Sequence, residues 1–182
     1  MSKLLFMLFS IGFVFIRLRF HTPERDTQTE VKPLREKILA TQFSLSLLIG
    51  HGWWLSQDGG VPLNNWSLWL GAICMGLSLP LLYWVHYSLG TYFSARLVLQ
   101  HEHSIIQNGP YRWVRHPMYS VGFLYLIGAG LLSSSWIVGC VPTLSFTLLV
   151  WLRIQDEEKM LSDFSDEYAS YMERTGRFFP KL

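Results

Sequence analysis

The feature that most constrains this chain is a series of five apolar stretches separated by polar loops. The stretches cover about residues 4–20, 38–55, 66–89, 119–132 and 136–153. A helix rises about 1.5 Å per residue, so the longer stretches can cross most or all of a hydrocarbon core about 30 Å thick. The last two are joined by a short serine turn at residues 133–135. The pattern predicts an all-α fold, a polytopic membrane helical bundle of about five transmembrane helices.

The composition supports a membrane environment. Half of the 182 residues are hydrophobic, 15% are charged, and the eight tryptophans exceed what a soluble domain of this length usually carries. The net charge of +2 is small, and no basic patch alternates with aromatic residues, so the sequence argues against a nucleic-acid partner. Cys74 and Cys140 both lie in apolar stretches and are expected to be small buried hydrophobic residues. The expected surroundings are therefore a lipid bilayer.

The first apolar stretch has some features of a secretory signal peptide. It lacks a clear cleavage site of small residues, and it carries Arg17 and Arg19 at its far end. We therefore interpret it as a retained membrane helix.

Basic residues in the loops predict the orientation. Residues 17–37 contain six Lys or Arg residues, whereas residues 56–65 contain none. Cytoplasmic loops carry the excess of basic residues, so residues 17–37, the segment 90–117 and the tail after residue 153 are all placed in the cytoplasm. The N-terminus is then outside, and the two polar regions 90–117 and 153–182 face each other on the cytoplasmic side. The predicted location is integral to the membrane and multi-pass.

The segment 108–120, NGPYRWVRHPMYS, predicts a functional site. It places two arginines, a histidine and three aromatic residues between stretches that are nearly pure hydrocarbon. A charged residue at the centre of a bilayer costs about 3 kcal/mol on insertion scales, so this cluster should lie at the membrane surface or line a polar cavity.

Simpler interpretations of the same segment stay open. Pro117 fits the first turn of a membrane helix, so the His-Pro step alone is compatible with a helix start. The aromatic residues fit an interfacial belt, Trp113 more readily than the tyrosines. Arg112 and Arg115 fit topology anchors, and for Arg112 this is the preferred interpretation. No histidine has a metal-ligand spacing with a carboxylate partner, so no metal site is expected.

The tail begins with a pair of opposite charges. Arg153 and Glu157 are four residues apart and share a helical face where the fifth apolar stretch ends. Alone, they would be a weak surface ion pair. Over residues 154–174, apolar residues recur at three- and four-residue spacings on a charged background, which predicts a C-terminal amphipathic helix ended by Gly176 and Pro180.

Together, the two polar regions suit a zwitterionic amino-acid cofactor that carries a purine. Such a ligand needs a positive group or backbone N–H groups for its carboxylate, an anion for its ammonium group and aromatic walls for its base. His116, Glu157, Tyr111 and Tyr119 have these chemistries.

The residues that carry this chemistry also carry a family resemblance. Residues 103–119, HSIIQNGPYRWVRHPMY, followed by a helical hairpin and by residues 153–180, RIQDEEKMLSDFSDEYASYMERTGRFFP, resemble the isoprenylcysteine carboxyl methyltransferase (ICMT) family of integral membrane enzymes. The resemblance covers about residues 90–180. It implies methyl transfer from S-adenosyl-L-methionine inside a bundle of membrane helices.

The resemblance also implies site residues. Arg153 would be the catalytic and substrate-binding residue, and Glu157 would face the cofactor. The other implied cofactor contacts are His103, Ser104, Ile105, Ile106, Tyr111, His116, Pro117, Met118 and Tyr119. A family glutamine shortly before residue 103 has no clear counterpart, and Phe164-Ser165 replaces the usual Phe-Gly step.

The expected acceptor is lipophilic or lipidated, and carboxyl O-methylation of the isoprenylcysteine type is the preferred reaction. A carboxylate needs no general base, whereas a thiol or amine would need one, with His116 or Glu157 as the candidates. The alternatives are a phospholipid, amine or thiol methyltransferase of the same superfamily, an NADPH-dependent sterol-type reductase and a non-enzymatic membrane scaffold.

The chain is interpreted as a single membrane domain, residues 1–182. Within it, residues 1–89 form N-terminal helices with no assignable motif, and residues 90–182 form the methyltransferase core. The oligomeric state is open.

Overall fold

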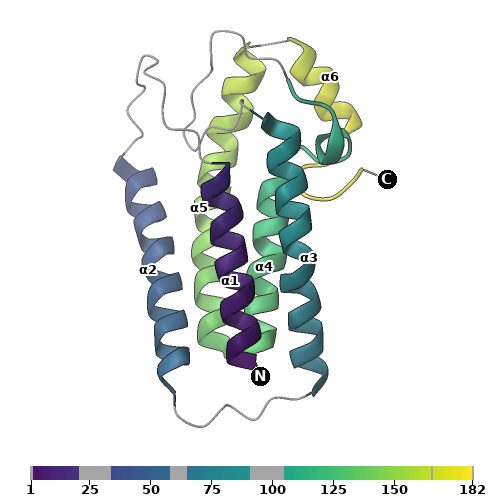
Figure 1. Ribbon diagram of the computed structural model, residues 1–182. Coiled ribbons are helices and arrows are strands. Elements are labelled where there is room, and N and C mark those ends of the chain that lie inside the picture. The colour runs from purple at the N-terminus through teal and green to yellow at the C-terminus, as the bar shows by residue number, and fades with distance from the viewer. Residues whose placement is uncertain (1, 21–33, 58–64, 91–104, 165, 182) are drawn as a thin grey trace.

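The computed structural model describes residues 2–20, 34–57, 65–90, 105–164 and 166–181. These residues form a bundle of long helices that lie side by side, with a short helix at one end (Figure 1). The helices are α1 (Ser2–Arg19), α2 (Leu34–Ser56), α3 (Asn65–Leu89), η2 (Gly109–Arg112), α4 (Pro117–Ser133), α5 (Trp136–Phe164) and α6 (Asp166–Arg174). The β pairing among the described residues is one isolated bridge between Val114 and Gly176. The prediction of an all-helical fold is confirmed.

Helices α1 to α4 have boundaries close to those of the first four apolar stretches, whereas α5 is longer than the fifth stretch. The predicted hairpin is present, since α4 ends at Ser133 and α5 begins at Trp136. However, α5 does not end near Arg153 but continues to Phe164, and the predicted helix over residues 154–174 is divided between the end of α5 and α6. The residues of α5 change from apolar to charged after Arg153, which alters the surroundings that the helix suits. The backbone hydrogen bonds do not depend on this change, so the helix continues.

Two of the described helices, Asn65–Leu89 and Trp136–Asp163, are long and apolar enough to cross a membrane. The helix Pro117–Ser133 is apolar but shorter. Glycines bring the helices of the hairpin into close contact: a Cβ atom at Gly130 would lie 2.6 Å from the Cα atom of Gly139. Small residues commonly allow such close approach between membrane helices.

The core of the bundle consists of two clusters. The larger one joins all five long helices through buried residues that include Phe6, Trp54, Met75, Leu132 and Val138. The second cluster packs Leu82, Val85, Tyr111 and Val121 together, so it lies where α3 ends and α4 begins.

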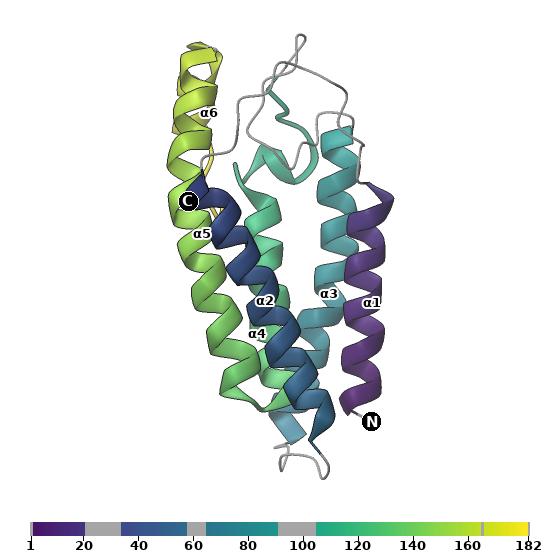
Figure 2. The same ribbon diagram turned by 90° about the vertical axis from the view of Figure 1, so that its left-hand side faces the viewer.

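The two ends of the bundle differ in character. At the end that holds the N-terminus, Lys3 Nζ on α1 donates to the carbonyl oxygens of Leu55 (2.9 Å) and Gln57 (2.6 Å) at the end of α2. The polar segments η2 and α6 lie at the opposite end (Figures 1 and 2). The motif before α4 and the C-terminal tail are therefore on the same side of the molecule.

Candidate functional site

The segment before α4 is held in an irregular conformation by its own residues. Gly109, the first residue of η2, has a φ of +56°, which favours glycine, and Pro110 follows it in the same turn. His116 is the N-cap of α4, and Pro117 is the first residue of that helix. Proline fits this position because the first helical N–H groups have no partner within the helix. The helix start that the simpler interpretation of the His-Pro step allowed is therefore present.

The C-terminal tail pairs with this segment through its backbone. The N–H of Arg115 donates to the carbonyl of Gly176 (2.9 Å), the N–H of His116 donates to that of Arg177 (3.1 Å), and the N–H of Gly176 donates to that of Trp113 (3.2 Å). These bonds order the backbone on both sides of the histidine.

Two side chains extend the contact between the tail and the motif. The Tyr171 hydroxyl group on α6 donates to the carbonyl of Tyr111 (2.6 Å). The Ser120 hydroxyl group on α4 donates to the carbonyl of Phe178 (2.7 Å). The tail therefore fastens α6 to both η2 and the start of α4.

Glu158 is the centre of this junction. Its side chain is 10% exposed, and its Oε1 atom lies 3.2 Å from His116 Nε2, 3.2 Å from Arg115 Nε and 3.1 Å from Arg177 Nε. Arg177 also donates to Oε2 through its Nη2 atom. One carboxylate on α5 thus holds two consecutive residues of the motif and one residue of the tail.

Arg115 adds further bonds to the tail. Its Nη1 atom donates to the carbonyl oxygens of Met172 (3.0 Å) and Thr175. The guanidinium group is therefore part of the junction rather than a topology anchor alone. We call Arg115, His116, Glu158 and Arg177 the Glu158 cluster.

Glu157 faces a different part of the site. Its Oε2 atom accepts a hydrogen bond from the Tyr119 hydroxyl group (2.9 Å) and lies 4.0 Å from His116 Nδ1. Its side chain is 27% exposed, more than that of Glu158. The rings of His116 and Tyr119 stack with centroids 5.6 Å apart. The imidazole of His116 therefore stands between the two carboxylates.

The tyrosines around the junction stay protonated. Burial raises the pKa of Tyr171 to about 12, although the positive charge of Arg115 opposes this shift. Burial also raises the pKa of Tyr111 and of Tyr168, with the carboxylate of Glu158 adding to the effect on Tyr168. The hydrogen bond with Glu158 raises the pKa of Arg177. At neutral pH these tyrosines are thus neutral, Tyr171 donates its hydrogen bond to Tyr111, and Arg177 is charged.

The remaining predicted site residues lie around this junction or outside the described residues. Arg153 is half-buried on α5, one helical turn before Glu157. Met118 and Ile106 pack against the second core cluster, and Ile105 is half-buried beside Ile106 in the chain. The predicted contacts His103 and Ser104 lie outside the described residues.

Sequence reasoning missed Glu158 and Arg177. The one hint of Glu158 in the sequence is that a second glutamate directly follows Glu157. Consecutive residues of a helix point about 100° apart, so the two glutamates contact different partners. It also missed Arg17, whose Nη1 atom on α1 lies 3.3 Å from Met118 Sδ on α4. No spacing along the chain reveals a contact between residues 101 positions apart.

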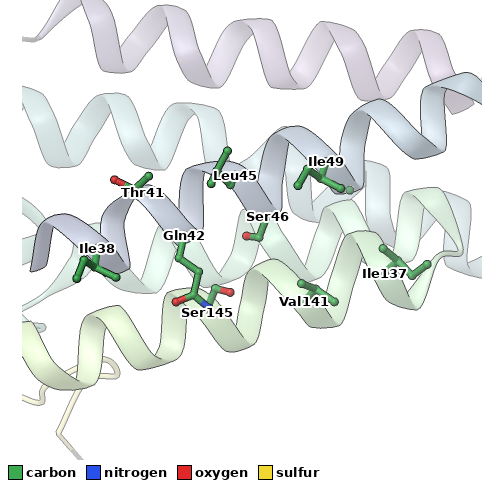
Figure 3. Close-up of a pocket in the computed structure, with 10 residues that line it drawn as sticks. Ile38, Thr41, Gln42, Leu45, Ser46, Ile49, Ile137, Val141 and Ser145 are labelled. Carbon is green, nitrogen blue, oxygen red and sulfur yellow. The ribbon is translucent and has the colours of Figure 1, made fainter. Parts of the chain in front are cut away.

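A separate groove of about 650 Å³ lies between α2 and α5. Figure 3 shows Gln42 of α2 and Ser145 of α5 pointing toward one another across it. Among the predicted site residues that the structure describes, none lines this groove. Phe43 and Phe146, whose rings are 5.1 Å apart, pack on the core side of the same helix pair. The groove is therefore not part of the candidate site.

Comparison with known proteins places the chain in a family. The model of the isoprenylcysteine carboxyl methyltransferase (ICMT) family matches residues 69–163, from the start of α3 to the end of α5. This range is just over half of the chain and contains most of the residues described above. The chain belongs to the ICMT family. The ICMT match thus spans both carboxylates and the motif before α4, whereas Arg177 of the Glu158 cluster lies beyond it.

The relatives of this chain include a protein-S-isoprenylcysteine O-methyltransferase and proteins with other names. The chain is 30% identical over 146 residues to the cobalt-zinc-cadmium resistance protein CzcN of Cupriavidus metallidurans, a match that covers 80% of this chain and 62% of the relative. It is 31% identical over 100 residues to the protein YpbQ of Bacillus subtilis, covering 54% of this chain and 60% of the relative. It is 33% identical over 84 residues to the protein-S-isoprenylcysteine O-methyltransferase of Tribolium castaneum, a match that covers 43% of this chain and 28% of the relative. The chain thus spans about three fifths of the length of the first two relatives.

Proposed function

We propose that this chain is a membrane methyltransferase that transfers a methyl group from S-adenosyl-L-methionine to a lipophilic acceptor, with an isoprenylcysteine-type carboxylate as the preferred acceptor. The observation that carries the proposal is the meeting of Tyr119, His116 and Glu157 at the polar end of otherwise apolar helices. Membership of the ICMT family supports the same reaction class.

The residues present fit the proposed cofactor. Glu157 accepts a hydrogen bond through Oε2, and a carboxylate has about four lone-pair sites, so it retains capacity for an ammonium group. The stacked rings of His116 and Tyr119 offer a flat wall for a purine. Ile105 and Ile106 are half-buried apolar residues close to the motif along the chain. When bound, the cofactor would supply an electrophilic methyl group on a positively charged sulfur.

In this proposal the neighbouring residues Glu157 and Glu158 have different roles. Glu158 is already engaged by three cationic or imidazole side chains, so it is a structural residue. Glu157 is more exposed and binds a neutral hydroxyl group, so it is the better partner for an incoming cation. Hence Glu157 would bind the cofactor, and Glu158 would keep His116 in place.

Arg153 would hold the acceptor. It lies one turn from Glu157 on α5, at the boundary between the apolar and the charged part of that helix. A carboxylate is already nucleophilic at neutral pH, so the protein contributes mainly orientation and the exclusion of water. A guanidinium group binds a carboxylate through two parallel hydrogen bonds and so fixes its direction.

The proposal includes five membrane crossings, with the N-terminus outside and the site on the cytoplasmic side. An acceptor could then reach the site from the bilayer and the cofactor from the cytoplasm. The basic residues near the polar end of the bundle support this orientation.

Binding of tritiated S-adenosyl-L-methionine to the purified chain in lipid nanodiscs tests the proposal. We expect saturable binding by the wild type and labelling of N-acetyl-S-farnesylcysteine. Glu157→Gln should weaken cofactor binding at least about tenfold, because a hydrogen bond to a charged group contributes about 1.5–3 kcal/mol. Glu173→Gln is the matched control, since Glu173 is exposed on α6 and its carboxylate is not part of the site. Binding of NADPH but not of S-adenosyl-L-methionine would contradict the proposal.

A further inference from the structure

The C-terminal tail turns back toward the bundle after α6 and lies beside the start of α4. The Ser120 hydroxyl group donates to the carbonyl of Phe178 (2.7 Å), and the rings of Phe178 and Phe123 have centroids 6.3 Å apart. Ser120 and Phe123 follow the first residue of α4 by about 4.5 and 9 Å along the helix axis. Figure 1 shows the tail below the level of α6. The tail therefore lies at the level of the first two turns of an apolar helix.

The two phenylalanines of the tail have opposite surroundings. Phe178 is half-buried, and its ring centroid lies 6.5 Å from that of His116. Phe179 is 79% exposed, more than any other large hydrophobic residue in the part of the chain that the structure describes. Phe178 thus packs against the bundle, whereas Phe179 points to whatever surrounds the bundle at this level.

Exposed tryptophans lie next to the turn that contains Phe179. Trp84 on α3 and Trp113 are both exposed, and their rings meet edge to face with centroids 6.1 Å apart. The carbonyl of Trp113 accepts a hydrogen bond from the N–H of Gly176, three residues before Phe179. Tryptophan is enriched where membrane proteins meet the boundary between lipid and water.

A third exposed tryptophan lies at the same level on α5. The rings of Phe146 and Phe123 have centroids 4.9 Å apart, so these two residues are level with each other on α5 and α4. Trp151 is exposed and lies about 7.5 Å along α5 from Phe146, toward the polar end of the bundle. It is therefore level with the start of α4. Tryptophans from three parts of the chain thus mark one boundary, and Phe179 lies at it.

We propose that Phe179 inserts into the boundary between lipid and water beside the start of α4, and that this insertion holds the tail against the candidate site. The proposal rests on the membrane crossings proposed above and not on methyl transfer. Its partner is the phospholipid surface of the leaflet on the side of the candidate site.

The basic residues on either side of the two phenylalanines suit the same partner. The Arg177 side chain is partly exposed although it binds Glu158. Lys181 is exposed, and its Nζ atom donates to the carbonyl of Glu173 (2.7 Å), which leaves two of its three donors for other groups. Basic side chains beside an inserted aromatic residue are typical of interfacial segments, because they attract lipid phosphate groups.

Insertion of Phe179 would support the bonds between the tail and the motif before α4. The carbonyl of Gly176 accepts from the N–H of Arg115 (2.9 Å), and that of Arg177 accepts from the N–H of His116 (3.1 Å). Removing an apolar ring from water is favourable in proportion to the area removed. The bilayer would therefore favour the state in which the tail is docked beside His116.

Spin labels on the full chain in phosphatidylcholine nanodiscs test the insertion. Cys74 and Cys140 are replaced by serine, and the nitroxide is attached to a Phe179→Cys, Leu144→Cys or Glu173→Cys variant. Molecular oxygen concentrates in hydrocarbon, whereas a nickel chelate stays in water. Leu144, 69% exposed on α5, is the control for lipid, and Glu173, exposed on α6, is the control for water.

We expect the label at position 179 to collide more often with oxygen than with the nickel chelate, as at position 144, and the label at position 173 to show the reverse. A preference for the chelate at position 179, with lipid contact at position 144, would overturn the inference and leave the membrane crossings standing. A preference for the chelate at position 144 would contradict the crossings and the inference together. Binding of S-adenosyl-L-methionine tests the methyl-transfer proposal separately.

A second measurement tests whether insertion holds the tail. Phe179→Ser should speed hydrogen exchange at the N–H groups of Arg115 and His116 at least about threefold, because the apolar burial that favours the docked tail is lost. Phe179→Trp should exchange as wild type does, because tryptophan suits the same boundary. Equal exchange in Phe179→Ser and wild type would show that the lipid contact does not hold the tail.

Discussion

At the scale of single residues, two neighbouring glutamates have different surroundings. Glu157 binds Tyr119 and is partly exposed, whereas Glu158 is buried among Arg115, His116 and Arg177. A buried charge that loses its partners is strongly destabilising, so removing either side of such a cluster should affect folding. The two glutamates should therefore respond differently to the same substitution.

Glu158→Gln should loosen the tail. The neutral amide keeps the shape but leaves Arg115 and Arg177 without their carboxylate, and breaking a buried ion pair costs about 3–5 kcal/mol. We expect a lower midpoint of thermal unfolding in detergent and faster hydrogen exchange at the backbone N–H groups of Arg115 and His116, which bond to the tail. Glu157→Gln should leave both exchange rates unchanged. Equal exchange in the two variants would show that Glu158 does not hold the tail.

At the scale of elements, the tail and the motif before α4 form one unit although α4 and α5 separate them in the chain. The backbone bonds from Trp113, Arg115 and His116 to residues 176 and 177 join them. They depend on a sharp change of direction after Gly176, where a Cβ atom would overlap the carbonyl oxygen of Phe179. The turn thus requires glycine for reasons of space.

Gly176→Ala should separate the tail from the motif, because the added methyl group cannot be accommodated without moving the backbone. We expect faster proteolysis after α6 and weaker binding of S-adenosyl-L-methionine by the full chain. Gly52→Ala on α2 is the control, since no atom lies within 4 Å of the added Cβ. That variant should behave as wild type, because alanine is favourable within a helix. An unchanged proteolysis pattern in Gly176→Ala would contradict the role of the turn.

At the scale of the whole molecule, the N-terminus and the candidate site lie at opposite ends of the bundle (Figure 1). If the bundle spans a bilayer, one end faces each side. The excess of basic residues at the site end predicts that this end is cytoplasmic.

Labelling of single cysteines in whole cells tests this orientation. Cys74 and Cys140 are first replaced by serine. A membrane-impermeant maleimide should then label the Gln57→Cys variant, whose cysteine follows α2, in intact cells. It should label the Lys181→Cys variant, whose cysteine is in the tail, only after the cells are permeabilised. Gln57 directly follows α2 and Lys181 lies beyond α6, so both positions are outside the helices. The reverse labelling pattern would place the site outside and contradict the proposed access of the cofactor from the cytoplasm.

The helices and the family were predictable from the sequence because both depend on local information. A long apolar stretch forms a helix whatever it packs against, and the hairpin at residues 133–135 needs only its own serines and neighbours. The division of the chain at residue 90 stays a prediction, as do the roles of Arg153 and Glu157. The end of α5 differs from the prediction because the residues become polar after Arg153 while the helical backbone continues to Phe164.

The sequence by itself determined that this chain forms apolar helices, with one polar motif before the fourth apolar stretch and another after the fifth. The tertiary structure decided which polar groups meet. Glu158 contacts Arg115, His116 and Arg177, which are 43, 42 and 19 residues away in the sequence. Arg17 contacts Met118, which is 101 residues away. Such partners depend on how the helices pack and rotate, and on where the tail folds back. Helix formation is a property of neighbouring residues, whereas these contacts exist only once the whole bundle has assembled.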